Sequence, residues 1–283
     1  MIRSLLLVSL AAGPLTMPAS PPETELAIRA ITVRPEEPVV GAYDSIRLVI
    51  DVVAMGAKGK DGVTVKVEPG APPGPVLADK LPDEPPAPSP APTPSATPSA
   101  VLAPEANDQP VGAVRLAPSL ALHATGALQA APAGGWETWR FLPDKRLNRY
   151  YPTGTWTITA TAKGAHGATV TEYASFQLRR ATKLTSVMAE KAGRSEGVRL
   201  SGSLRRVDPR GYTGYGPFAK QPLEILWRPD ESSGWEKAGQ TTTDASGAFE
   251  TTVTDRTDGL WRVRYLGTGH YASDLSKSQQ ITQ

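Results

Sequence analysis

The chain has 283 residues, with 30 Lys and Arg, 28 Asp and Glu, 28 Pro and no Cys. Its formal net charge of +2 does not single out nucleic acid as a partner. The absence of cysteine excludes disulfides, thiolate metal ligands, cysteine nucleophiles and lipid attached to cysteine. The length predicts about two domains, at about 150 residues each.

The N-terminus has the pattern of a secretory signal. Arg3 supplies a positive charge, residues 5–12 form a short apolar run, and small residues follow at Ala19 and Ser20. The run is shorter than the roughly 18 apolar residues that a membrane span needs. We therefore expect residues 1–22 to be a signal peptide and the mature chain to be secreted, with no membrane span. The alternative is an N-terminal tail without a signal function.

Residues 69–118 differ from the rest of the chain in composition. They hold 15 of the 28 prolines, and residues 85–98 consist only of Pro, Ala, Ser and Thr. Such a segment cannot bury enough apolar surface to offset the entropy of ordering it. We predict a disordered, extended insertion over about residues 69–118 that serves as a spacer or an exposed arm.

Both sides of this segment read as β-structure, because apolar and polar residues alternate with a period of two and turn residues separate the runs. Ile46, Leu48, Ile50 and Val52 illustrate the alternation. No segment carries a helical stripe with caps. Residues 244–247 and 255–259 supply turns, the first of them a hairpin. The expected strands are 45–53, 63–67, 121–125, 135–141, 156–162, 169–178, 198–207, 223–228, 235–243, 248–254 and 260–266.

An internal repeat relates the two halves of the chain. Residues 154–160 align with residues 259–265 at an offset of 105, and residues 46–48 align with residues 198–200 at an offset of 152. The offsets differ by 47 residues, which is about the length of the Pro-rich stretch. The repeat predicts two copies of one β-sandwich, the first of them interrupted by the insertion.

Residues 243–253 and 258–276 are similar to the C-terminal end of bacterial immunoglobulin-like (Ig-like) domains, which recur in secreted and surface proteins of high-GC Gram-positive bacteria. The resemblance covers residues 182–283 well and residues 24–180 less well. It implies an all-β fold of two Ig-like domains, residues 23–180 and 181–283, with Trp156 and Trp261 packed at the sandwich corners. Thr153 stands in the first copy where Asp258 stands in the second. The motif specifies a fold and not a chemistry.

The residue types that usually carry catalysis or metal binding do not form a recognisable motif. His123, His166 and His270 lie outside any zinc-binding pattern, and no serine completes a nucleophile elbow. No Asp-rich calcium loop or phosphate-binding loop occurs. We therefore expect no catalytic residue, no cofactor and no metal, although spacing in sequence does not exclude a carboxylate pair that folding brings together.

The loop of residues 208–218 is the most informative candidate for recognition. It places Tyr212, Tyr215 and Phe218 among glycines between two expected strands. Sandwich loops commonly carry recognition, and tyrosine provides contact area at a low entropy cost. The alternative is that these aromatic side chains fold back and cover one open end of the sandwich.

Two further segments supply candidate binding residues. Trp136 and Trp139 lie three positions apart on one expected strand, so they face opposite sides, one toward the core and one toward solvent. The exposed indole is a candidate for stacking on a sugar. Arg149 and Tyr150 belong to a basic, aromatic segment that is suited to contact a wall polymer, with a solvated loop as the alternative.

These features predict a non-catalytic, monomeric protein, secreted or at the cell surface, that contacts a protein or a cell-wall polysaccharide and not nucleic acid. Two alternatives stay open. One is an extracellular hydrolase accessory or a glycan-active enzyme with an unrecognised site. The other is a regulatory protein that docks on a partner through its Pro-rich arm.

Overall fold

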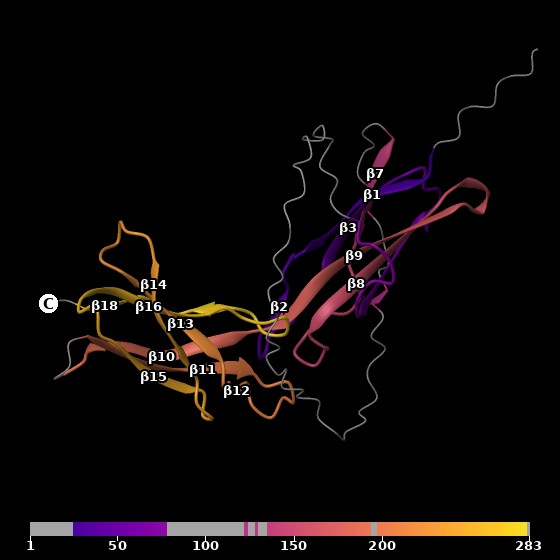
Figure 1. Ribbon diagram of the computed structural model, residues 1–283. Coiled ribbons are helices and arrows are strands. Elements are labelled where there is room, and N and C mark those ends of the chain that lie inside the picture. Colours follow the sequence, from indigo (N-terminus) through magenta and orange to yellow (C-terminus); the bar gives the residue numbers. More distant parts are fainter. Residues whose placement is uncertain (1–24, 78–121, 124–127, 130–134, 194–196, 282–283) are drawn as a thin grey trace, which may run out of the picture.

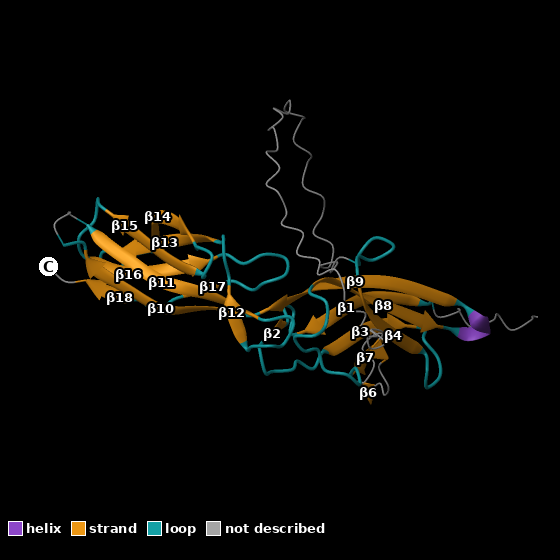
Figure 2. Cartoon of the chain, turned by 90° about the horizontal axis from the view of Figure 1, so that it is seen from below, coloured by secondary structure: helices purple, strands orange, loops and turns teal. Residues whose placement is uncertain are grey.

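The computed structural model describes residues 25–77, 122–123, 128–129, 135–193 and 197–281 (Figure 1). These residues form strands, loops and one turn of 3-10 helix, η1 (Ala165–Gly167). The strands build two β-sandwiches that lie end to end (Figure 1, Figure 2). The expected signal peptide, residues 1–22, lies outside the described residues, as does most of the expected insertion.

The first sandwich consists of two sheets, with strand orders β1-β3-β7-β6 and β2-β9-β8-β4-β5. β2 runs parallel to β9, and the other paired strands of this sandwich are antiparallel. The strands are β1 (Ala27–Arg34), β2 (Val39–Val40), β3 (Val49–Met55), β4 (Val63–Pro69), β5 (Leu122–His123), β6 (Leu128–Gln129), β7 (Trp136–Phe141), β8 (Gly154–Lys163) and β9 (Thr169–Arg180).

The second sandwich repeats this plan. In one sheet β11 pairs with β10 on one side and with β12 and β15 on the other, and in the second sheet the order is β14-β13-β16, with β17 and β18 both pairing with β16. The strands are β10 (Thr182–Lys191), β11 (Val198–Val207), β12 (Tyr215–Pro217), β13 (Pro222–Arg228), β14 (Glu236–Thr242), β15 (Ala248–Val253), β16 (Gly259–Tyr265), β17 (Asp274–Leu275) and β18 (Gln279–Ile281).

The order in which the chain visits the sheets identifies both sandwiches as Ig-like. β1, β3 and β7 share a sheet in the first copy, as β10, β11 and β15 do in the second, while β4 and β8 correspond to β13 and β16. Apart from the short strand β2, which joins the other sheet between β1 and β3, the chain crosses between sheets in the same order both times, as in the Greek-key topology of Ig-like domains. The predicted fold class, all-β with two Ig-like sandwiches, is confirmed.

The insertion leaves the first sandwich after β4 and returns at β5. Residues 70–77, which the composition assigned to the insertion, still belong to the fold, because the Leu77 amide donates to the Tyr173 carbonyl of β9 at 2.7 Å. Residues 78–121 lie outside the described residues. The insertion therefore connects two neighbouring strands of one sheet, since β4 pairs with β5.

Each sandwich has its own hydrophobic core, centred on an equivalent tryptophan. Trp156 of β8 and Trp261 of β16 are both 0% exposed. Their indole N–H groups donate to main-chain carbonyls just upstream, of Pro152 at 2.9 Å and of Asp258 at 3.1 Å. This hydrogen bond lets a large, amphipathic ring be buried without an unpaired donor. The two tryptophans are 105 residues apart, which is the offset of the sequence repeat.

Two local expectations differ from the structure. The turn of residues 244–247 is not a hairpin, because β14 and β15 belong to different sheets and the turn carries the chain from one sheet to the other. Asp244 organises that turn by accepting hydrogen bonds from the amides of Ser246 and Ala248. Strands β1 and β10 were not predicted from the sequence; each is the first long strand of its sandwich.

Candidate binding surface at the joint between the sandwiches

The connection between the two sandwiches is a single residue, Ala181, between β9 and β10. Its amide donates to the Val40 carbonyl of the first sandwich at 2.9 Å, and its carbonyl accepts from the Val207 amide of the second at 3.1 Å. Arg180 continues this pairing, because its amide donates to the His270 carbonyl at 2.9 Å. Main-chain hydrogen bonds from both sides therefore hold the linker in place.

The Arg180 side chain also holds the joint together. Its guanidinium donates to the carbonyls of Arg149 at 3.0 Å and Tyr151 at 3.1 Å, and to the Thr153 hydroxyl at 3.3 Å. Burial lowers the pKa of Arg180, as expected for a cation removed from water. Thr153 in turn lies 3.1 Å, Oγ1 to Nδ1, from His270 of the second sandwich. The three acceptors of Arg180 belong to the first sandwich, as Arg180 does. Across the joint, a side-chain hydrogen bond links Arg180 to Tyr271, and Thr153 contacts His270.

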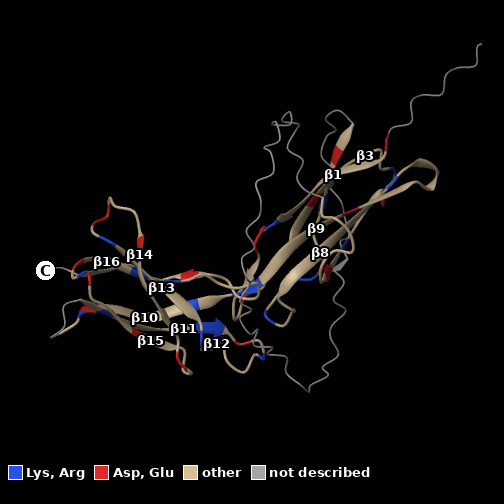
Figure 3. Cartoon of the chain, in the orientation of Figure 1, with Lys and Arg blue, Asp and Glu red and all other residues tan. Residues whose placement is uncertain are grey.

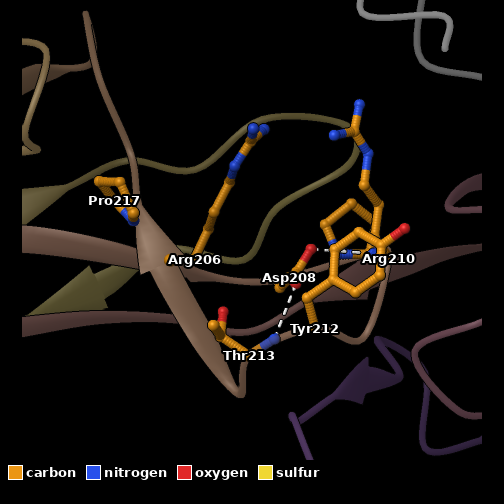
Figure 4. A pocket seen from close by; sticks show the side chains of 8 residues that line it. Arg206, Asp208, Arg210, Tyr212, Thr213 and Pro217 are labelled. Atoms are coloured by element: carbon orange, nitrogen blue, oxygen red, sulfur yellow. Dashed lines mark hydrogen bonds between the residues drawn. The ribbon is translucent and has the colours of Figure 1, made fainter.

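The loop between β11 and β13 is built around Asp208. Its carboxylate accepts hydrogen bonds from the amides of Arg210 at 2.9 Å and Thr213 at 3.0 Å (Figure 4). Burial opposes ionisation of Asp208, but these backbone N–H groups outweigh it and lower the pKa of the carboxyl group. The carboxylate therefore fixes the conformation of the loop segment that carries Tyr212.

The first sandwich contributes three side chains that lie against this loop. Arg149 donates to the Thr213 carbonyl at 2.9 Å, and its guanidinium lies 5.8 Å from the Tyr43 ring centroid and 5.2 Å from that of Tyr150. These distances are within the range of cation–π contact. A Cβ atom at Gly214 would collide with the Tyr43 hydroxyl, so glycine at this position permits the close approach.

These contacts create a surface with large exposed aromatic side chains. Tyr43, Tyr150 and Tyr212 are 83%, 62% and 86% exposed, and they come from three separate segments of the chain. We call Tyr43, Arg149, Tyr150, Arg210 and Tyr212 the joint surface. Basic residues also lie at the ends of β9 and β11, next to the joint (Figure 3).

A hollow of about 320 Å³ adjoins the joint surface. Arg206, Asp208, Arg210 and Tyr212 are among the residues that line it. The guanidinium groups of Arg206 and Arg210 extend to the same side of the loop, on either side of Asp208 (Figure 4). Arg206 is held by a hydrogen bond to the Tyr271 hydroxyl at 3.1 Å. The hollow thus presents hydrogen-bond donors beside an aromatic ring.

No protein-family model matches the chain, and no curated protein matches its sequence. Solved structures similar to it include the tetra-tandem repeat in the extending region of a large adhesion protein, with 12% identity, a TM-score of 0.29, and coverage of 91% of this chain and 50% of that one. The Ig1–Ig3 ectodomain of mouse nectin-like molecule 4 has 9% identity, a TM-score of 0.26, and coverage of 89% and 64%. The D0–D1 domain of intimin has 12% identity, a TM-score of 0.23, and coverage of 90% and 99%.

This chain therefore spans half the length of the adhesion-protein repeat that it matches. TM-scores of this size mean that the molecules superpose poorly over their whole length. The assignment of an Ig-like fold accordingly rests on the strand order of this chain itself.

The aromatic residues predicted in the loop of residues 208–218 divide between two roles. Tyr212 is exposed, whereas Phe218 is 6% exposed and packs with ring centroids 4.7 Å from Tyr271 and 5.7 Å from Tyr265. Tyr215 is half-buried in β12, and its carbonyl accepts from Arg205 at 3.0 Å. The loop thus both covers the end of the second sandwich and presents one tyrosine to solvent.

Trp136 and Trp139 do not contribute to the joint surface. Trp139 is 6% exposed and belongs to the first core. Trp136 is half-buried on the outer face of its sheet, where the Arg29 guanidinium lies 5.1 Å from its ring centroid. A sugar that stacked on Trp136 would have to compete with Arg29 for the ring.

Sequence reasoning missed three residues of the joint, namely Tyr43, Arg180 and Arg210. Arg210 lies in the loop of residues 208–218 but was not singled out there, whereas Tyr43 and Arg180 lie in segments far from that loop and only folding brings them to it. Within the described residues, no group of three or more His, Cys, Asp or Glu side chains is placed to hold a metal ion. The described part of the chain also contains no helix long and apolar enough to cross a membrane.

Proposed function

We propose that this protein is a non-catalytic binding protein that contacts a macromolecular partner through the joint surface. The observation that carries the proposal is the gathering of three exposed tyrosines and two arginines from both sandwiches around a loop that Asp208 holds in place. Tyrosine and arginine are the residue types that supply most of the binding energy at protein interfaces. A loop that is already ordered loses little entropy when a partner binds.

The finer features of the proposal follow from the sequence. We propose that the chain is exported and acts outside the cell or at the cell surface as a monomer, with a protein or a wall polysaccharide as its partner. We also propose that residues 23–180 and 181–283 are independently folding domains. No specific observation among the described residues favours an enzymatic site or docking through the Pro-rich segment, so we propose neither.

The test is retention of the purified chain on immobilised cell wall and on immobilised extracellular proteins. Replacing Tyr212 and Tyr150 by Ala removes two exposed rings and should weaken binding about tenfold or more, because tyrosine is enriched among the hot-spot residues whose truncation costs about 2 kcal/mol or more. Leu275→Ala is the matched control, since Leu275 is 47% exposed on the second sandwich but lies outside the joint surface. Retention that is the same for all three chains would refute the proposal.

A further inference from the structure

A second cluster of basic and aromatic side chains lies on the outer face of the sheet formed by β14, β13, β16 and β18. In the register of β13 and β16, Leu226 is opposite Arg262 and Arg228 is opposite Leu260. Alternate residues of a strand share a face, so Arg228 and Arg262 project from the same side of the sheet as diagonal neighbours. Trp261 of β16 points the other way, into the core.

Trp235, in the hairpin between β13 and β14, packs on both arginines. The guanidinium carbons of Arg228 and Arg262 lie 4.6 Å and 4.5 Å from its ring centroid. We call Arg228, Trp235 and Arg262 the Arg–Trp face. The hairpin extends from the second sandwich on the side away from the first (Figure 1), so this face is separate from the joint surface.

The two arginines of this face have no carboxylate partner among the described residues. Arg228 donates to the Glu231 carbonyl at 2.8 Å, and Arg262 makes a long contact of 3.5 Å to the Ser278 hydroxyl. The nearby carboxylate of Glu224 is already paired, with Arg264 at 2.6 Å and Lys237 at 3.1 Å. These two partners lower the pKa of Glu224, so it stays ionised and engaged. Neither arginine therefore has its charge neutralised by a direct ion pair within the described part of the chain, although Asp230 and Glu231 lie in the same hairpin.

The indole holds both guanidinium groups in position. A guanidinium that lies over an aromatic ring keeps N–H groups at its edge, which can donate two hydrogen bonds to one planar carboxylate. The Nε atoms of Arg228 and Arg262 are buried, so the terminal Nη groups are the donors that a ligand meets. Prior fixation of these groups reduces the entropy lost on binding.

We propose that the Arg–Trp face binds an acidic segment of a protein partner, with Asp or Glu carboxylates on Arg228 and Arg262. Two arginines without a direct ion pair favour an anionic ligand. A sugar ring would have to share the Trp235 ring with the two guanidinium groups that already lie over it. Carboxylates presented by a peptide need only the guanidinium edges, and Trp and Arg are enriched where protein partners meet.

The test measures binding of a fluorescent Glu-rich peptide to the full chain by anisotropy, at low and at physiological salt. The same peptide with Gln in place of Glu is the neutral probe, and polygalacturonate is the acidic polysaccharide probe. We expect the Glu-rich peptide to bind and the Gln-rich peptide not to bind. Arg228→Gln and Arg262→Gln should each weaken binding about tenfold, the loss expected when a charged hydrogen-bonding group is removed.

Arg199→Gln is the matched control, because it removes the same charge from the other sheet of this sandwich, where Arg199 is paired with Glu190 at 3.3 Å. It should change the affinity less than twofold, apart from the general effect of net charge. An Arg199 variant that loses as much affinity as the Arg262 variant overturns the proposal. Binding of polygalacturonate without binding of the Glu-rich peptide also overturns it, as does the absence of binding at low salt. Circular dichroism and melting of each variant show that the sandwich remains folded.

Discussion

Arg180→Ala tests whether a buried arginine side chain fixes the two sandwiches relative to each other. The substitution leaves the main-chain hydrogen bonds of the linker in place, including the one from the Arg180 amide to the His270 carbonyl. It removes the guanidinium donors to the carbonyls of Arg149 and Tyr151 in the first sandwich, and the side-chain hydrogen bond to Tyr271 of the second sandwich. Any effect therefore reports on the side chain and not on the backbone connection.

The size of the effect follows from the two carbonyls that lose their donors. A buried acceptor without a partner costs about 1–3 kcal/mol, so two of them cost about 2–6 kcal/mol if the site stays dry. Water entering the vacated space recovers part of this cost. The guanidinium also loses hydration when it is buried, which is why the pKa of Arg180 is lowered. We therefore expect a loss of about 2 kcal/mol in the free energy of unfolding.

Two measurements check this expectation, namely denaturant unfolding and small-angle X-ray scattering. The scattering curve of Arg180→Ala should show a broader distribution of interatomic distances, because the sandwiches change their relative orientation more freely. Arg199→Ala is the control, since its exposed ion pairs with Glu190 and Glu250 contribute about 1 kcal/mol or less. If Arg180→Ala costs no more than the control and scatters like the wild type, the side chain does not hold the joint.

Three further substitutions test individual contacts. Hydrogen bonds from Arg140 lower the pKa of Asp51, so the stability that Asp51 provides is present above about pH 4 and is lost as the pH falls through its folded pKa. Acid titrations of wild type and Asp51→Asn should converge below that range, and a constant difference would contradict this. Burial raises the pKa of Tyr265 to about 12, so its contribution is present below pH 10 and is lost as the pH rises toward 12. Alkaline unfolding should be weaker in Tyr265→Phe, and an equal response would exclude Tyr265 as the cause. Trp261→Ala should cost about 3–5 kcal/mol, and calorimetry should show that it lowers the transition of the second sandwich alone; an equal fall in both transitions would mean that the sandwiches do not unfold independently.

The strands that sequence analysis predicted best are those with uninterrupted alternation after a glycine. β8 and β16 both begin at glycines, Gly154 and Gly259, whose φ angles of 109° and 89° disfavour any other residue. The tryptophan two positions later points into the core in both sandwiches. The need for glycine at a positive φ and the need for a buried tryptophan therefore fall within three residues of each other. Both copies keep this pair of residues, which is why the repeat can be recognised in the sequence.

The two long strands that the sequence did not predict, β1 and β10, contain irregularities in their pairing. β1 shifts register between Ile28 and Ala30, and β10 shifts between Thr185 and Met188, where Ser186 has a φ of 52°. A bulge adds a residue to one strand and moves every following side chain to the opposite face. The period of two is then broken in the middle of the strand. In β1 and β10 the alternation is too short on either side of the bulge to mark a strand, whereas β13 and β14 were predicted although their pairing also shifts between Ile225 and Leu226.

The sequence indicated some residues of the joint surface but not that they form one surface. Arg149, Tyr150 and Tyr212 drew attention as basic and aromatic residues in loops, but they were assigned to separate candidate sites. Their meeting depends on a linker of one residue and on the hydrogen bond from Arg149 to the Thr213 carbonyl. Both features depend on how the two sandwiches are joined, and neither can be predicted from composition or from the period of the apolar residues.

The place of the insertion explains why a sandwich tolerates so long an interruption. Val67 of β4 pairs with Leu122 of β5, so the two ends of the intervening chain are neighbours in one sheet. The entropy cost of closing a loop between fixed ends rises only with the logarithm of its length, at about 0.6 kcal/mol for each doubling. The second sandwich joins the corresponding strands, β13 and β14, through a hairpin of a few residues. Lengthening that connection in the first copy costs little, and it leaves the paired core strands β4, β8 and β9 undisturbed.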